Sequence, residues 1–316
     1  MFGVSQIIGA LLMYGVGRID TSFHTWRLMF LICGALTIIT GVVFLWLMPR
    51  DTSTAWFLTE RERTLAAARL ALDRATRDRT NFNWPQAKEA FTDPRTYMYA
   101  LMGITITLPT AIVKFSSIVI QGFGFSDFQT LLVGLPGGAL AFCLVWIGAL
   151  VPTHYPNARC YTGLFVVAMP LLGSLLLLLL PASKNWGIVV STWFAGSTAP
   201  PLNIVLGLLA SNVRGNTKKS VVGAIFFIIF CVGSIASPQF WQAADAPRYR
   251  KGCIVSVCSW AVLLTMLMTF LFTAKRSNAK RDLKAQEDSD YSEQGVPVSV
   301  DSDHTERQDC RFRYTH

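Results

Sequence analysis

Charged residues are scarce in this chain: 15% of its 316 residues are Asp, Glu, Lys or Arg, against roughly 25% in an average soluble domain. Its seven cysteines include no pair at a metal-binding spacing such as C-x-x-C. Its first residues contain neither a basic stretch nor an A-x-A cleavage pattern. We therefore expect neither a water-soluble globule, nor a cysteine-based metal site, nor a cleaved signal peptide.

The apolar residues, 52% of the chain, are gathered into blocks of membrane-spanning length. A helix needs about 20 mainly apolar residues to cross the ~30 Å hydrocarbon layer. The sequence therefore predicts an all-α, polytopic transmembrane helical bundle with about eight spans. These are residues 2–17, 27–48, 97–120, 128–151, 161–180, 186–210, 221–241 and 253–274.

The net charge of +9 raises the question of nucleic-acid binding, but the positions of the basic residues indicate a membrane protein. Of the 28 Lys and Arg residues, 21 lie in the tail and in the gaps on one side of the predicted spans, and six lie in the alternate gaps. Cytoplasmic loops of membrane proteins carry the excess of Lys and Arg. The sequence therefore predicts a multi-pass membrane protein whose central loop and C-terminus are cytoplasmic. We expect the membrane to be the plasma membrane. Its expected surroundings are the lipid bilayer, and nucleic acid is not an expected partner.

The longest gap between spans, residues 50–96, is too polar to cross the membrane. Thr59 followed by Glu62 is a capping-box pattern and predicts a surface helix, and Trp84 is expected to begin a second short helix. We interpret this gap as a connector along the lipid headgroups, with a regulatory site as the alternative. Beyond Asn278 the residues become polar and acidic, which predicts a disordered tail.

Two of the predicted spans, 97–120 and 186–210, carry proline and polar residues near their centres. Proline lacks an amide donor and frees a helix carbonyl, which lipid cannot satisfy but a water-filled cavity can. Interrupted helices at matching depth are typical of a transporter's central site, and ordinary proline kinks are the alternative. The candidate substrate-binding residues at the two breaks are Thr107, Pro109, Thr110, Thr198, Pro200 and Asn203.

Lys114 is the only basic residue well inside a predicted span. It is a further candidate substrate-binding residue because a cation inside the membrane can bind an anion, and snorkelling to the membrane surface is the alternative. No Asp or Glu lies in any of the eight spans. This absence excludes a retained carboxylate proton relay. Because the spans also lack paired metal ligands, we expect no enzyme activity, metal or cofactor.

Several short motifs follow one another along the chain. They are Phe57-Leu58-Thr59 with Glu62-Arg63, Trp84 with Gln86, Glu89-Ala90 and Asp93, Gly122-Phe123-Gly124-Phe125, Thr130 with Leu132, Pro136 and Gly138, Thr217-Lys218-Lys219, Pro238-Gln239, and Ala246-Pro247 with Tyr249 and Gly252. In this order and spacing they resemble the fungal allantoate permease family, the anion:cation symporter branch of the major facilitator superfamily. The resemblance extends over about residues 26–282.

Members of that family have twelve spans in two six-helix halves. The resemblance implies secondary active, proton-coupled uptake of small organic anions, such as allantoate or related carboxylates, by alternating access. It aligns this chain with spans five to twelve, so we expect a member truncated at its N-terminus. The two broken spans then correspond to the seventh and tenth, which line the transport cavity in the superfamily. The alternative is a non-transporting membrane remnant or an interaction protein.

The predicted organisation has four parts. Residues 1–49 are the remnant of the N-terminal half with two spans, 50–96 are the cytoplasmic central loop, 97–274 are the C-terminal six-helix half, and 275–316 are a disordered cytoplasmic tail.

Overall fold

Helices form the secondary structure of this protein, and no strand occurs in the part of the chain that the structure describes. The computed structural model describes residues 2–17, 19, 24–73, 82–121, 127–155, 157–181, 185–242, 245, 249–289, 303–309 and 312–316. The α-helices are α1 (Phe2–Gly17), α2 (Thr25–Leu47), α3 (Glu60–Asp73), α4 (Trp84–Thr92), α5 (Pro94–Thr107), α6 (Ala111–Gln121), α7 (Asp127–His154), α8 (Arg159–Leu179), α9 (Asn185–Ala195), α10 (Ala199–Asn212), α11 (Asn216–Ala236) and α12 (Arg250–Ser289). Among the described residues, the 3₁₀ turns η1 (Thr52–Thr54), η2 (Leu108–Thr110) and η3 (Ser237–Phe240) lie between these helices.

Among the described residues, seven helical stretches are long and apolar enough to cross a membrane. They are Thr25–Leu47, Pro94–Ser117, Gln129–His154, Arg159–Leu179, Trp186–Asn212, Asn216–Phe240 and Arg250–Gln286. Each of them overlaps one predicted span. The remaining predicted span coincides with α1, which is apolar but shorter. The expected all-α bundle of membrane-spanning helices is therefore confirmed.

The chain divides into two compact units. The larger unit holds the described residues within Met1–Leu11, Phe82–Gly295 and His304–His316, and the smaller unit holds those within Leu12–Asn81 and Val296–Asp303. The boundary at Phe82 differs from the predicted one, which assigned all of residues 50–96 to a single central loop.

Helix α4 belongs to the larger unit because it packs on the start of α11. Its Gln86, Ala87 and Ala90 are buried. The side-chain oxygen of Gln86 accepts hydrogen bonds from the backbone amides of Thr217 and Lys218, at 3.1 and 3.3 Å. These amides lie in the first turn of α11, where they have no partner within the helix. The second half of the predicted loop is thus part of the bundle.

In the smaller unit, α2 is apolar along its length and has no buried residue, which suits a helix that meets lipid. Half of the predicted capping box is present before α3, where Glu62 reaches back and accepts hydrogen bonds from the amide and the hydroxyl of Thr59, at 3.0 and 2.9 Å. These two bonds hold the pKa of Glu62 below its usual value. Arg63 adds two hydrogen bonds to the carbonyl of Ala55, which ties the helix start to the preceding turn.

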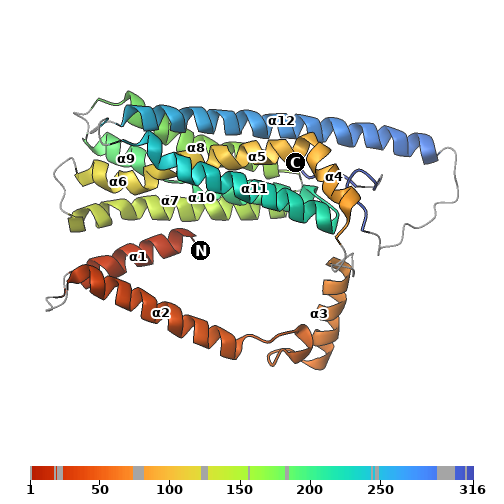
Figure 1. Ribbon diagram of the computed structural model, residues 1–316, viewed down its shortest axis with the longest axis horizontal. Coiled ribbons are helices and arrows are strands. Elements are labelled where there is room, and N and C mark those ends of the chain that lie inside the picture. The colour runs from red at the N-terminus through yellow and green to blue at the C-terminus, as the bar shows by residue number, and fades with distance from the viewer. Residues whose placement is uncertain are drawn as a thin grey trace. The chain divides into compact units, whose positions relative to one another are not determined.

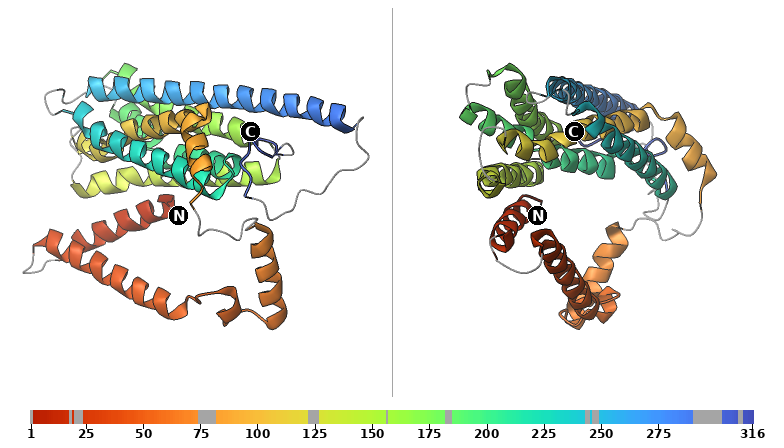
Figure 2. Two further views of the ribbon diagram at one scale, coloured as in Figure 1. Left: turned by 45° about the vertical axis from the view of Figure 1, so that its right-hand side comes forward. Right: turned by 60° about the vertical axis from the view of Figure 1, so that its left-hand side comes forward.

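In the larger unit, α5, α7, α8, α10, α11 and α12 lie side by side with their long axes roughly aligned (Figures 1 and 2). Helix α5 packs on α11, and α8 packs on both α9 and α12. One buried apolar cluster includes Tyr99, Met102, Leu208, Trp260 and Leu267, which come from α5, α10 and α12. Because these helices share a single core, the larger unit can hold interrupted spans in fixed register with their neighbours.

The predicted disordered tail is wrong for much of residues 275–316. Helix α12 continues to Ser289, and the described residues of 304–316 pack against the bundle. Glu306, Phe312 and Tyr314 are buried there. Polar composition suggested disorder, but these three side chains find partners on helices that are distant in sequence. Residues 290–302 lie outside the described residues. The motif residues Gly122–Phe125 and Ala246–Pro247 also lie outside them.

Candidate functional site

The first predicted break is present between α5 and α6. Helix α5 ends at Thr107, Leu108–Thr110 form the 3₁₀ turn η2, and α6 begins at Ala111. Pro109 lies in this turn and has no amide to donate. The hydroxyl of Thr110 donates to the carbonyl of Thr107 at 2.6 Å and so satisfies one carbonyl at the end of α5.

Ser237, at the start of η3, bonds to both sides of this break. Its hydroxyl accepts a hydrogen bond from the amide of Ala111 at 3.0 Å and donates one to the carbonyl of Leu108 at 2.7 Å. Backbone groups freed by a break within the membrane need such partners, because lipid offers none. One side chain from the next element thus stabilises the interruption. The sequence analysis assigned no role to Ser237.

The second predicted break separates α9 from α10. Helix α9 ends at Ala195 and α10 begins at Ala199, so Gly196–Thr198 connect them without helical structure. The amide of Thr198 donates to the carbonyl of Gly196 at 2.8 Å. This bond joins residues only two apart, whereas the bonds of a helix join residues three or four apart. Pro200 lies in the first turn of α10, where a missing amide costs nothing. The α-helix is thus interrupted in both spans, by the 3₁₀ turn η2 in the first and by Gly196–Thr198 in the second.

Each break packs closely against a glycine of a neighbouring helix. Gly233 of α11 lies against the side chain of Thr107, and Gly173 of α8 lies against the backbone amide of Ala195. A methyl group built on Gly173 would also lie 2.7 Å from the Cβ atom of Phe194. Small residues allow helices within a membrane to approach this closely. Neither glycine was singled out from the sequence, because nothing local distinguishes them from other glycines in apolar runs.

The residues that flank the two breaks meet in one buried apolar cluster. Ala111 and Ile112, which follow the first break, and Ala195, which precedes the second, pack with Trp241, Tyr249 and Cys253. The rings of Phe115, Trp241 and Tyr249 lie 5.4 to 5.6 Å apart. Helix α6, which follows the first break, and helix α9, which precedes the second, are also in contact (Figure 1). The structure thus brings the two interruptions to the same region of the bundle.

The predicted polar side chains at these breaks differ in exposure. Thr107 is buried, and its hydroxyl donates to the carbonyls of Gly103 and Ile104. Thr110 is half-buried, whereas Asn203 is exposed. Of the remaining candidates, Thr198, Pro109 and Pro200 are buried. Lys114 lies within α6, but its side chain is outside the described part of the structure.

Comparison with known proteins places these features in context. Residues 1–238 match the family described as Major Facilitator Superfamily. An uncharacterized transporter of Schizosaccharomyces pombe, C757.13, is 31% identical over 99% of this chain and 59% of its own length. Allantoate permease of Saccharomyces cerevisiae is 28% identical over 100% of this chain and 60% of its own length.

A thiamine pathway transporter of Saccharomyces cerevisiae is 27% identical over 90% of this chain and 55% of its own length. The chain thus spans about three-fifths of the length of the curated relatives that it matches. No solved structure matches it.

Proposed function

The chain belongs to the major facilitator superfamily, and from that membership we propose that it acts as a transporter that takes up small organic anions together with protons. The superfamily and the names of the relatives indicate a transporter rather than an enzyme. The observation that carries the proposal is the pair of interrupted helices, α5–α6 and α9–α10, whose breaks lie in one region of the bundle. Alternating access would then rock the bundle around that region.

The composition of the interrupted spans favours an anionic substrate. Neither residues 97–120 nor residues 186–210 contain an Asp or Glu, so an organic cation would meet no carboxylate there. The same stretches offer the hydroxyl of Thr198 and the positive charge of Lys114. Hydrogen bonds from hydroxyls and ammonium groups suit a carboxylate. Proton coupling rests on the resemblance to symporters alone, because the eight predicted spans hold no acidic residue.

An uptake assay tests this proposal. The preceding N-terminal portion of allantoate permease would be joined to this chain, and the chimera would be expressed in yeast cells that lack their own allantoate permease. We expect saturable accumulation of radiolabelled allantoate or of another small carboxylate that increases as the external pH is lowered. A chimera that reaches the plasma membrane but accumulates no carboxylate would contradict the proposal and favour a non-transporting interaction protein.

Substituting Lys114 tests whether the anion binds at the first interrupted span. We expect Lys114→Met to weaken apparent affinity for the anion by roughly ten- to a hundredfold, the effect of losing one hydrogen bond to a charged group. Lys114→Arg should retain part of the affinity because the charge remains. The measurement is the concentration dependence of uptake by the chimera. Equal affinity in the parent, Lys114→Met and Asn203→Ala would remove these side chains from the site.

The membrane orientation is part of the proposal and gives a further prediction. We expect α4 to face the cytoplasm and the start of α12 to face the outside, because 21 basic residues lie on the first side and six on the other. Lys88 and Lys251 are exposed positions on these two helices. In sealed cells, an impermeant thiol reagent should label Lys251→Cys but not Lys88→Cys, after subtraction of the labelling of the parent protein. Labelling of Lys88→Cys but not of Lys251→Cys would indicate the opposite orientation and contradict the prediction.

A further inference from the structure

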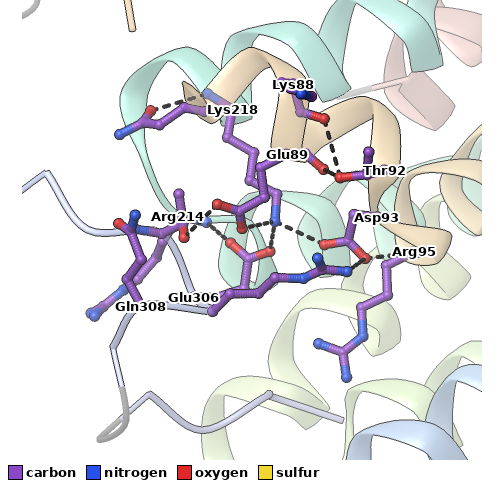
Figure 3. Close-up of polar contacts among 12 residues, drawn as sticks. Lys88, Glu89, Thr92, Asp93, Arg95, Arg214, Lys218, Glu306 and Gln308 are labelled. Carbon is purple, nitrogen blue, oxygen red and sulfur yellow. Dashed lines mark hydrogen bonds and ion pairs between the residues drawn. The ribbon is translucent and has the colours of Figure 1, made fainter. Parts of the chain in front are cut away.

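A buried cluster of charges lies at the start of α11. The side chain of Lys218 is 1% exposed, and its Nζ donates to Glu89 of α4 at 2.9 Å and to Asp93, which precedes α5, at 2.8 Å (Figure 3). Its third partner is Glu306, whose side chain is 2% exposed. One ammonium group therefore holds two carboxylates of the α4–α5 segment and one of the C-terminal segment.

The three carboxylates have further partners around them. The guanidinium of Arg307 lies 3.4 Å from Asp93, the hydroxyl of Thr305 donates to Glu89 at 3.0 Å, and the amide of Arg214 donates to Glu306 at 3.1 Å. Burial opposes the ionisation of Asp93, but its hydrogen bond and charge attraction to Lys218 outweigh burial and hold its pKa below the usual value. Asp93 is thus set up to remain charged, as a buried ion cluster requires.

Two asparagines hold the backbone that follows Glu306. Asn278 of α12 accepts from the amide of Tyr314 and donates to its carbonyl, both at 2.9 Å. Asn212 of α10 does the same for Thr315, at 2.8 and 3.1 Å. Each asparagine side chain therefore satisfies both backbone groups of one residue. This pairing recognises extended backbone in the way that a neighbouring strand does.

Aromatic side chains of the same segment are held between arginines. The guanidinium of Arg95 lies 3.4 Å from the ring centre of Tyr314, and that of Arg281 lies 4.9 Å from it. Arg281 also donates to the carbonyls of Phe312 and Glu306, at 2.6 and 2.7 Å. Such cation–π contacts strengthen when they are removed from water. The rings of Phe312 and Tyr314 are buried in the main apolar cluster of the bundle.

We propose that the described residues of 304–316, which are 304–309 and 312–316, form a strap, docked on a surface made by α4, α5, α10, α11 and α12, that couples the two interrupted spans. The strap contacts α5 through Arg95 and α10 through Asn212. These helices also meet directly, because the hydroxyl of Tyr99 donates to the carbonyl of Leu208 at 3.3 Å. While the strap is docked, α5 and α10 move as one body, and bending at the breaks is confined to α6 and α9. This role in transport rests on the proposed function.

Hydrogen exchange of the full chain, purified in lipid nanodiscs, tests the docking. In the parent protein the amides of Tyr314 and Thr315 should exchange slowly, because Asn278 and Asn212 hold them. Glu306→Gln keeps the shape of the side chain but removes its charge, and we expect these amides to exchange roughly ten- to a hundredfold faster. Asp282→Asn is the matched control, because it removes only the ion pair to Arg313 on the surface. Exchange in the parent at the rate of an unstructured peptide, or no change in Glu306→Gln, would overturn the docking.

A distance measurement tests the coupling. Leu101 of α5 and Leu206 of α10 are exposed and can be replaced by spin-labelled cysteines in a background without other cysteines. We expect a narrow distribution of label distances in the parent and in Asp282→Asn, and a broader one in Glu306→Gln. Equal widths in all three proteins would overturn the coupling of α5 to α10.

Neither measurement needs a substrate, so the two proposals can fail separately. If the chimera takes up no carboxylate while Glu306→Gln shows faster amide exchange and a broader distribution of label distances, the transport proposal is contradicted and the strap is supported. If uptake succeeds while Glu306→Gln behaves like the parent in both measurements, the strap is contradicted and transport is supported.

Discussion

Replacing Lys218 with methionine is expected to lower the free energy of unfolding by about 3–5 kcal/mol, the usual cost of removing one partner of a buried ion pair. Methionine has a similar length but no charge, so Glu89, Asp93 and Glu306 would face one another without their shared ammonium group. Thermal unfolding of the purified full chain, followed by tryptophan fluorescence, measures the loss.

Lys219 offers a matched control on the next residue. It is exposed, and its Nζ donates to the carbonyl of Ala210, at 3.0 Å. We expect Lys219→Met to change stability by no more than about 0.5 kcal/mol, as is usual for surface substitutions. Equal unfolding temperatures for Lys218→Met and Lys219→Met would show that the cluster does not stabilise the bundle.

The loss in Lys218→Met should also depend on pH. Without the lysine, Asp93 loses the hydrogen bond and the charge attraction that hold its pKa low, so burial and repulsion raise that pKa in the folded variant, and protonation then relieves the repulsion. A group whose pKa is raised in the folded state gains stability as the pH falls. We therefore expect the difference between the parent and Lys218→Met to become smaller as the pH is lowered from about 7 towards about 5.

A methyl group at Gly173 is expected to destabilise the bundle by about 1–3 kcal/mol, the usual cost of adding a carbon to a tightly packed interior. In Gly173→Ala the new carbon would overlap the backbone amide of Ala195, which cannot move aside as a flexible side chain could. Helix α9 would have to shift away from α8 at the point where the break between α9 and α10 begins. We therefore expect uptake by the chimera to fall as well.

Gly223 of α11 provides the control for this substitution. A Cβ atom there would meet no other atom within 4 Å. Because alanine favours a helix over glycine by up to about 1 kcal/mol, Gly223→Ala should leave stability unchanged or raise it. We thus expect Gly173→Ala to lower the unfolding temperature and Gly223→Ala to leave it unchanged or raise it. A Gly173→Ala protein as stable as Gly223→Ala would contradict the close packing of α8 on α9.

The helix breaks could be predicted from the sequence because their cause is local. Pro109 and Pro200 lack an amide wherever they occur, and the polar residues beside them lie in otherwise apolar stretches. The groups that stabilise each break could not be predicted. Ser237 lies more than a hundred residues from Leu108, and only the packing of η3 on η2 brings its hydroxyl to the break.

The tail shows the opposite case. Residues 275–316 are polar on average, and average composition predicted disorder. Composition does not show that Glu306 pairs with a buried lysine 88 residues earlier in the chain, or that Tyr314 lies against Arg95. Burying a charged side chain costs much free energy when it is alone and less when it is paired. Whether a polar segment is ordered therefore depends on the partners that its charges find.

The sequence by itself determined that this is a helical membrane protein with its spans in a set order and two of them interrupted. Hydropathy and proline act over one turn or one span of the chain, so these features can be recognised without the fold. Only the tertiary structure decided which glycines accept a neighbouring backbone, which hydroxyl satisfies a break, and which residues surround Lys218. Those outcomes depend on contacts between helices far apart in sequence, whose geometry is set by the packing of the whole bundle.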